Sequence, residues 1–169
     1  ETGFYNSSHA GTQAVGPHKG LVSFITPHTH AIIQKYLARG EKEMPIAVVF
    51  GIPPAFEIMG NFSGLHMDLW GEMEMVGTIM DMDIEMVPCE TIPLTVPAHA
   101  EIIVEAVVDL TSQTDVGVGV SPSMYYLPKT ATLPDMHIQA ITMRKDRPIY
   151  RNHLTTPDTD HQTLPRLCH

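Results

Sequence analysis

Positively charged residues are scarce in this sequence. It contains 10 Lys and Arg against 19 Asp and Glu, which gives a formal net charge of −9 at pH 7. The basic residues form no run and are not interleaved with aromatic side chains. This balance argues against nucleic acid or an anionic lipid surface as the main partner, because both are bound through clusters of Lys and Arg.

Long hydrophobic runs are also missing. No apolar stretch approaches the roughly 20 residues that a membrane-spanning helix needs, and no secretory signal is visible at the start of the chain. We therefore expect no membrane partner. The chain begins with Glu1 rather than Met, which we interpret as a processed chain or a piece of a longer one.

Cysteine is nearly absent. Cys89 and Cys168 lie far apart and form no CxxC pair. They could form one disulfide, but we favour two reduced thiols in a cytoplasmic protein. The sequence also has no HExxH, GxSxG or phosphate-binding P-loop motif. Residues 117–119 read Gly-Val-Gly and lack the third glycine of a dinucleotide-binding fingerprint.

The remaining composition is that of one globular domain. The chain has 169 residues, of which 43% are hydrophobic and 17% are charged, so it can bury a core without disulfides. Eleven methionines are present. They serve either as adaptable core side chains or as the lining of a site for a flat aromatic ligand.

The hydrophobic pattern predicts a mixture of strands and helices without strict alternation. Expected strands are residues 21–26, 45–51, 84–89, 100–110 and 136–143, and expected helices are residues 29–40, 55–59 and 70–80. Gly40 is a suitable C-cap for the first helix. Residues 1–20 and 111–123 are expected to be loops. The fold class is therefore α+β, with a mostly antiparallel sheet or a partly open barrel.

Two of these segments have a clear facial pattern. In residues 100–110, every second side chain is apolar, whereas Glu101, Glu105 and Asp109 fall on the opposite face of the strand. In residues 70–80, the apolar side chains share one helical face, and Glu72 is expected to point toward a different, more open side.

Three segments resemble the central domain of the UbiD family of decarboxylases. Residues 44–55 read MPIAVVFGIPPA, residues 97–107 read PAHAEIIVEAV, and residues 140–150 read AITMRKDRPIY. The resemblance implies a split β-barrel of the flavin-reductase, FMN-binding type with flanking helices. It places the cofactor-binding domain in residues 1–150 and leaves residues 151–169 as a polar tail. The flanking N- and C-terminal regions of family members have no counterpart here.

The resemblance also implies a cofactor and a metal site. Family members bind prenylated FMN, and an Asn, a His and a Glu hold a divalent ion that bridges to the cofactor phosphate. The matching residues are Asn6, His30 and Glu72. His28 and His30 form the tightest histidine pair in the chain. An amide, an imidazole and a carboxylate suit Mn²⁺ or Mg²⁺, and the ion would offset the phosphate charge in an acidic protein.

The family's acid–base residues are not matched. Family members use an Arg in an early loop and two Glu residues after the long strand. Gly11, Val116 and Ser121 stand at those positions here. Asp115, one residue from the first Glu position, is our candidate for the catalytic acid after a shift of the loop. Glu101 and Glu105 match strand glutamates of the family, and we expect a solvated face or a buried ion pair for them.

The sequence therefore supports three hypotheses. The first is a prenylated-FMN-dependent carboxy-lyase acting on an aromatic or α,β-unsaturated carboxylic acid, with a homo-oligomer or a partner chain supplying the missing flanking regions. The second is a non-catalytic cofactor-binding or assembly subunit of the same fold that works with a complete partner. The third is a metal-binding domain without flavin.

Overall fold

The computed structural model describes residues 6–24, 26–60, 71–116 and 131–146. Ten elements lie within them, in the order β1 (Gly11–Ala14), β2 (Lys19–Ser23), α1 (Pro27–Ala38), β3 (Glu43–Phe50), α2 (Pro54–Gly60), α3 (Glu72–Met80), β4 (Met86–Pro88), β5 (Thr95–Pro97), β6 (Ile102–Val116) and β7 (Ala131–Met143). None of the helices in this part of the chain is long and apolar enough to cross a membrane.

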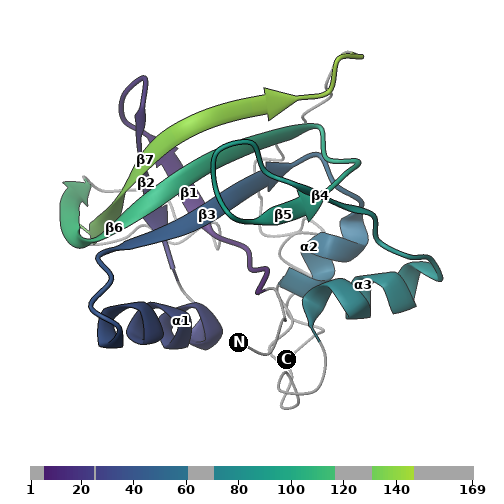
Figure 1. Ribbon diagram of the computed structural model, residues 1–169, viewed down its shortest axis with the longest axis horizontal. Coiled ribbons are helices and arrows are strands. Elements are labelled where there is room, and N and C mark those ends of the chain that lie inside the picture. Colours follow the sequence, from purple (N-terminus) through teal and green to yellow (C-terminus); the bar gives the residue numbers. More distant parts are fainter. Residues whose placement is uncertain (1–5, 25, 61–70, 117–130, 147–169) are drawn as a thin grey trace, which may run out of the picture.

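A five-stranded sheet forms the centre of the molecule (Figure 1). Its strand order is β1-β2-β7-β6-β3, and every neighbouring pair is antiparallel. Strands β4 and β5 form a separate antiparallel hairpin. The prediction of an α+β fold with a mostly antiparallel sheet is confirmed.

The sheet buries one face in a core built from alternate residues of its strands. Val22, Ala106, Val108 and Met136 are its buried members. The register explains their meeting, because Met136 pairs with Gly20 of β2 on one side and with Val108 of β6 on the other. The alternation predicted for residues 100–110 is therefore confirmed for Ala106, Val108 and Leu110, which pack in this core.

The opposite face of β6 carries Glu105, which is 1% exposed. Its carboxylate accepts hydrogen bonds from the backbone N–H groups of Glu90 and Thr91 at 2.8 and 2.6 Å, and from the Thr91 hydroxyl at 2.6 Å. These bonds fasten the loop between β4 and β5 to the sheet. The expectation of a solvated face or a buried ion pair is wrong for Glu105, because backbone amides surround its charge.

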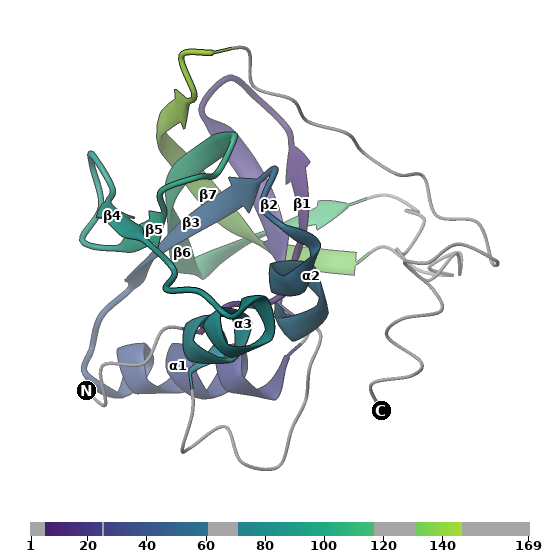
Figure 2. The same ribbon diagram turned by 90° about the vertical axis from the view of Figure 1, so that its right-hand side faces the viewer.

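The helices lie below the strands in Figure 1, with α1 on one side and the α2–α3 pair on the other. A second apolar cluster holds α2 against α3, with Phe56, Met59 and Val76 buried at its centre. Figure 2, turned by 90°, shows both α1 and α3 on the same side of the sheet, with α3 nearer the viewer. The predicted helices are confirmed. α1 ends at Ala38 with Arg39 as its C-cap, so the predicted C-cap, Gly40, lies one residue further on, with a φ of 76° that glycine adopts easily.

Several boundaries differ from the prediction. β1 lies within the expected loop 1–20, β5 is an additional short strand, and β6 continues to Val116 through the expected loop 111–123. Cys89 has a free thiol. Cys168, the tail 151–169 and Ser121 lie outside the described residues.

Candidate functional site

The N-terminal ends of α1 and α3 face each other in Figure 1, and the segment that leads into β1 passes beside them. α1 begins with Pro27 and α3 begins with Glu72. Neither N-cap residue, Thr26 of α1 or Gly71 of α3, makes a side-chain hydrogen bond to the backbone N–H groups in the first turn of its helix. Two helix ends of this kind place partial positive charge at one location.

Asn6 is tied to this location through α1. Its Nδ2 donates a hydrogen bond to Oγ1 of Thr29 at 3.3 Å. Thr29 is 6% exposed. Its hydroxyl also contacts Oγ of Ser8 at 3.5 Å and Oγ1 of Thr26 at 2.8 Å. The loop before β1 and the first turn of α1 are therefore joined by a cluster of hydroxyls around one buried oxygen.

Glu72 approaches the same loop from α3. Burial raises the pKa of the Glu72 carboxyl, while hydrogen bonds from its own backbone N–H and that of Ser7, together with the nearby His28 side chain, act in the opposite direction. The side chain is 6% exposed, so the expectation that Glu72 points to a more open side is wrong. A cation placed here would favour the ionised carboxylate.

The two imidazoles of α1 differ in their surroundings. His28 is half-buried and is close enough to influence Glu72, whereas the His30 side chain is exposed. The backbone N–H of His30 donates to the Thr26 carbonyl at 3.2 Å and so belongs to the first turn of the helix. The structure thus brings Asn6, Ser7, His28 and Glu72 into one region. The choice of His30 as a ligand stays a prediction.

The positions expected for the acid–base residues lie on the sheet. Gly11 is the first residue of β1, opposite Ser23, and Val116 is the last residue of β6, opposite Ala131. The carboxylate of Asp115 is exposed and accepts a hydrogen bond from the Thr132 hydroxyl at 2.8 Å. Asp115 is therefore held by the neighbouring strand and reaches solvent.

A polar network that the sequence did not reveal lies close to this end of β6. Asp135 is 5% exposed and accepts hydrogen bonds from the hydroxyls of Ser112 and Thr114. Lys19 lies 3.0 Å from the same carboxylate. The two hydroxyls, with a smaller contribution from Lys19, lower the pKa of Asp135 to about 2 despite the burial that opposes this shift. Together with the two hydroxyls, this ion pair links β2, β6 and β7.

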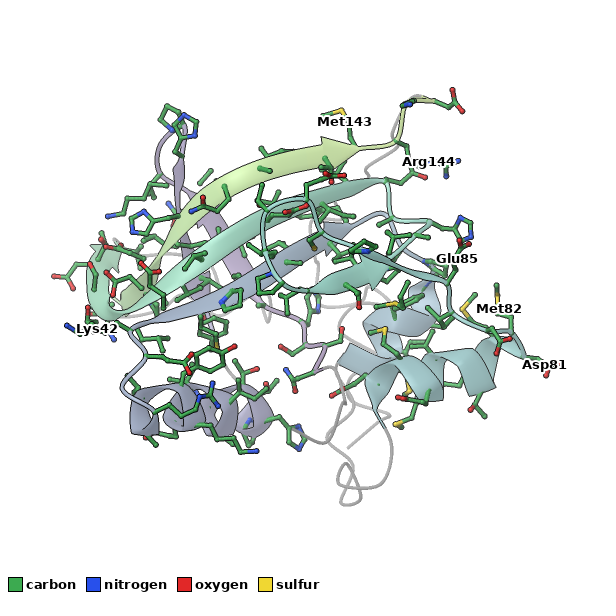
Figure 3. The ribbon with its side chains drawn as sticks, in the orientation of Figure 1. Lys42, Asp81, Met82, Glu85, Met143 and Arg144 are labelled. Atoms are coloured by element: carbon green, nitrogen blue, oxygen red, sulfur yellow. The ribbon has the colours of Figure 1, made fainter. Side chains whose placement is uncertain are left out.

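A small apolar cavity of about 40 Å³ lies away from these groups, lined by residues that include Phe56, Met80 and Met82. Figure 3 shows Met82 and Glu85 beyond the C-terminal end of α3, the end opposite to Glu72. The cavity is therefore separate from the region where the N-termini of α1 and α3 face each other.

No three His, Cys, Asp or Glu side chains come together as a metal site in the described part of the chain. A cation beside Glu72 would therefore need the amide of Asn6 or an external ligand such as a phosphate. Carboxylate, amide and imidazole groups are all present there, and they suit a hard divalent ion.

Comparison with known proteins decides the family. The UbiD family domain, described as the 3-octaprenyl-4-hydroxybenzoate carboxy-lyase Rift-related domain, matches residues 1–157. The chain belongs to the UbiD family. Its UbiD-class structural neighbours include an evolved dimeric form of HmfF from Pelotomaculum thermopropionicum in complex with prFMN, with a TM-score of 0.83 and 24% identity over 95% of this chain and 36% of that one.

Two curated UbiD-type relatives are decarboxylases by name. Anhydromevalonate phosphate decarboxylase of Methanothermobacter thermautotrophicus is 31% identical over 105 residues, which cover 62% of this chain and 24% of the relative. Ferulic acid decarboxylase 1 of Candida dubliniensis is 30% identical over 154 residues, which cover 88% of this chain and 27% of the relative. The chain thus spans about a quarter of the length of these enzymes.

Proposed function

We propose that this chain is the cofactor-binding domain of a carboxy-lyase that reversibly decarboxylates an aromatic or α,β-unsaturated carboxylic acid with prenylated FMN and Mn²⁺ or Mg²⁺. The proposal takes the sheet to be a split β-barrel of the flavin-reductase type. The observation that carries it is the meeting of the Asn6 loop, the start of α1 and the buried Glu72 carboxylate.

Each group has a defined part in this proposal. Asn6, Glu72 and an imidazole of α1 would hold the cation, with His30 as the predicted ligand and His28 as its neighbour. The N–H groups in the first turns of α1 and α3, which receive no hydrogen bond from an N-cap side chain, would add positive potential for a phosphate. When bound, prenylated FMN supplies the electron sink for decarboxylation. The protein would position that cofactor and exclude water around it.

Proton delivery needs a residue other than those at the family's positions, because Gly11 and Val116 carry no ionisable side chain. Asp115 is the proposed acid, since its carboxylate is exposed beside Val116 at the end of β6. The absence of the family's Arg and Glu at these positions favours a second candidate function. In it, the chain is a cofactor-binding or assembly subunit, and a partner chain supplies the acid–base residues and the flanking regions.

One set of measurements separates these functions. The protein is incubated with prenylated FMN and Mn²⁺, and its visible spectrum, metal content and CO₂ release from a cinnamic acid are recorded. Cofactor and metal binding with CO₂ release supports the enzyme. Binding without turnover until a complete family member is added supports the subunit. A protein that takes up metal but no flavin is a metal-binding domain, and one that binds neither refutes the proposal.

Matched variants then assign the imidazole. His28→Ala and His30→Ala remove neighbouring rings from the same helix turn. The variant that loses Mn²⁺ affinity identifies the ligand. Loss of affinity in His28→Ala alone would refute the prediction of His30.

A further inference from the structure

The hydroxyl of Thr29 is the central atom of the polar cluster at the start of α1. It contacts three side chains from two segments: Asn6 at 3.3 Å, Ser8 at 3.5 Å and Thr26 at 2.8 Å. Thr29 is also the buried residue of α1. A buried hydroxyl with three partners has a fixed position, because it offers one hydrogen and two lone pairs.

The three partners can occupy both lone pairs and the hydrogen of the Thr29 hydroxyl. The NH₂ group of Asn6 can only donate, so it occupies one lone pair of the Thr29 oxygen. Of the hydroxyls of Ser8 and Thr26, one can donate to the second lone pair and the other can receive the Thr29 hydrogen. Thr29 is β-branched, so its χ1 angle is restricted as well. The acceptor that Asn6 meets is therefore held by both packing and hydrogen bonds.

This arrangement orients the Asn6 amide. An amide has one end that can ligate a cation, the carbonyl oxygen, and one end that cannot, the NH₂ group. Thr29 engages the NH₂ end, so the carbonyl oxygen Oδ1 is turned away from Thr29 and is left for another partner. Asn6 is exposed, and without this contact its amide would be free to rotate.

We propose that Thr29 is the positioning residue of the cation site: its hydroxyl holds the NH₂ of Asn6 so that Oδ1 faces the divalent ion. The inference rests on the proposed function, because it requires the ion. Groups that orient metal ligands in this way typically contribute about 10- to 100-fold in metal affinity.

A double-mutant cycle between positions 6 and 29 tests the proposal. Thr29→Val keeps the shape of the side chain and removes the hydroxyl, and we expect it to weaken Mn²⁺ binding about 10- to 100-fold. Asn6→Asp replaces the amide with a carboxylate, both ends of which are oxygen ligands. In the Asn6→Asp background, Thr29→Val should therefore cost little affinity. A purely structural role for Thr29 would lower affinity equally in both backgrounds.

Mn²⁺ affinity is measured by electron paramagnetic resonance of the free ion. In the metal-free protein, the side-chain NH₂ resonances of Asn6 should shift in Thr29→Val and stay near their original position in Thr29→Ser. Thr78→Val is the matched control, because the Thr78 hydroxyl donates to the Glu74 carbonyl at 2.8 Å on the exposed side of α3. It should leave affinity unchanged.

The outcomes are distinguishable. Equal Mn²⁺ affinity in Thr29→Val and the parent protein overturns the positioning role and leaves the proposed function intact. Absence of Mn²⁺ binding by the parent protein overturns both. If Thr29→Val does not fold, Thr29→Ser takes its place, since it keeps the hydroxyl but loses the methyl group that restricts χ1. Unaltered affinity and unaltered Asn6 resonances then support the role, and a large loss of affinity contradicts it.

Discussion

The carboxylate of Glu105 accepts hydrogen bonds from both the backbone N–H and the hydroxyl of Thr91, each at 2.6 Å. Glu90 adds a third donor. Together these groups lower the pKa of Glu105, with the hydrogen bonds acting against the burial that would raise it. A single buried charge on β6 thus fixes the loop of the β4–β5 hairpin, and no cationic side chain among the described residues forms an ion pair with it.

We expect Glu105→Gln to destabilise the protein by about 1 to 3 kcal/mol, because the amide can replace only one of the two acceptor oxygens and leaves a buried donor unpaired. Urea unfolding followed by circular dichroism measures the change. The matched control is Glu41→Gln, which breaks an exposed ion pair with Arg39. It should cost less than about 1 kcal/mol. Equal effects of the two variants would contradict the role given to Glu105.

Asp135 should make the free energy of unfolding depend on pH in the acidic range. Its pKa is about 2 in the folded protein and 3.8 as the reference value. A carboxyl group with a lowered pKa in the folded state contributes stability above its unfolded pKa and loses it as the pH falls through the folded value. The contribution is on the order of 1–2 kcal/mol, reduced from the full shift because Lys19 is partly exposed to solvent.

The measurement compares the parent protein with Asp135→Asn from about pH 6 down to about pH 2. The difference in the free energy of unfolding between them should shrink as the pH falls, because the carboxylate becomes protonated. Asp83→Asn, a change at an exposed residue, should show no such trend. A constant difference for Asp135→Asn across the range would contradict the ionised network.

Gly40 ends α1 in a left-handed conformation. Its N–H donates to the Leu37 carbonyl at 2.9 Å, and the N–H of Glu41 donates to the Tyr36 carbonyl at 3.1 Å. These bonds form a Schellman motif. A Cβ at Gly40 would meet nothing within 4 Å, so Gly40→Ala should cost about 1 kcal/mol purely through its φ of 76°.

Thermal unfolding measures this cost, with Gly16→Ala as the control. The Cβ of that variant would make an ordinary contact of 3.8 Å with Lys19, and Gly16 has no positive φ. We expect Gly16→Ala to leave stability unchanged or to raise it slightly. If Gly40→Ala were as stable as the parent protein, α1 would end differently in solution.

Elements with a strong local pattern were predictable from sequence. Gly40 marks the end of α1, and the apolar alternation around Ala106 marks β6. β1 was missed because all four of its residues are exposed, so burial leaves no trace in their sequence. It exists because Gly11 to Ala14 pair with β2, a contact between strands that no local pattern encodes.

The candidate site divides in the same way. The family resemblance indicated Asn6 and Glu72, which the structure places near the start of α1. Their surroundings were not predictable. Helical periodicity placed Glu72 off the apolar face, but in the structure Glu72 is buried and hydrogen-bonded by Ser7. The ion pair of Lys19 and Asp135 joins residues more than 100 positions apart in the sequence. Both depend on tertiary packing.

Glu72→Gln should change stability in opposite directions with and without metal. Burial raises the pKa of the Glu72 carboxyl, so the ionised form lowers stability at neutral pH when no cation is near. A neutral amide removes that cost, and the metal-free variant should be more stable than the metal-free parent. Mn²⁺ at 100 times its dissociation constant should stabilise the parent by about 2.7 kcal/mol, and the variant should lose most of this gain.

Thermal and urea unfolding of the parent and Glu72→Gln, each with and without Mn²⁺, measure both the cost of the buried charge and the stabilisation by the ion. Glu74→Gln is the control, since Glu74 lies two residues along α3 and is exposed. It should retain the stabilisation by Mn²⁺. If Glu72→Gln responded to Mn²⁺ like the parent, the ion would be bound elsewhere. If the metal-free variant were instead less stable than the parent, the hydrogen bond from Ser7 to the ionised carboxylate would outweigh the cost of its burial.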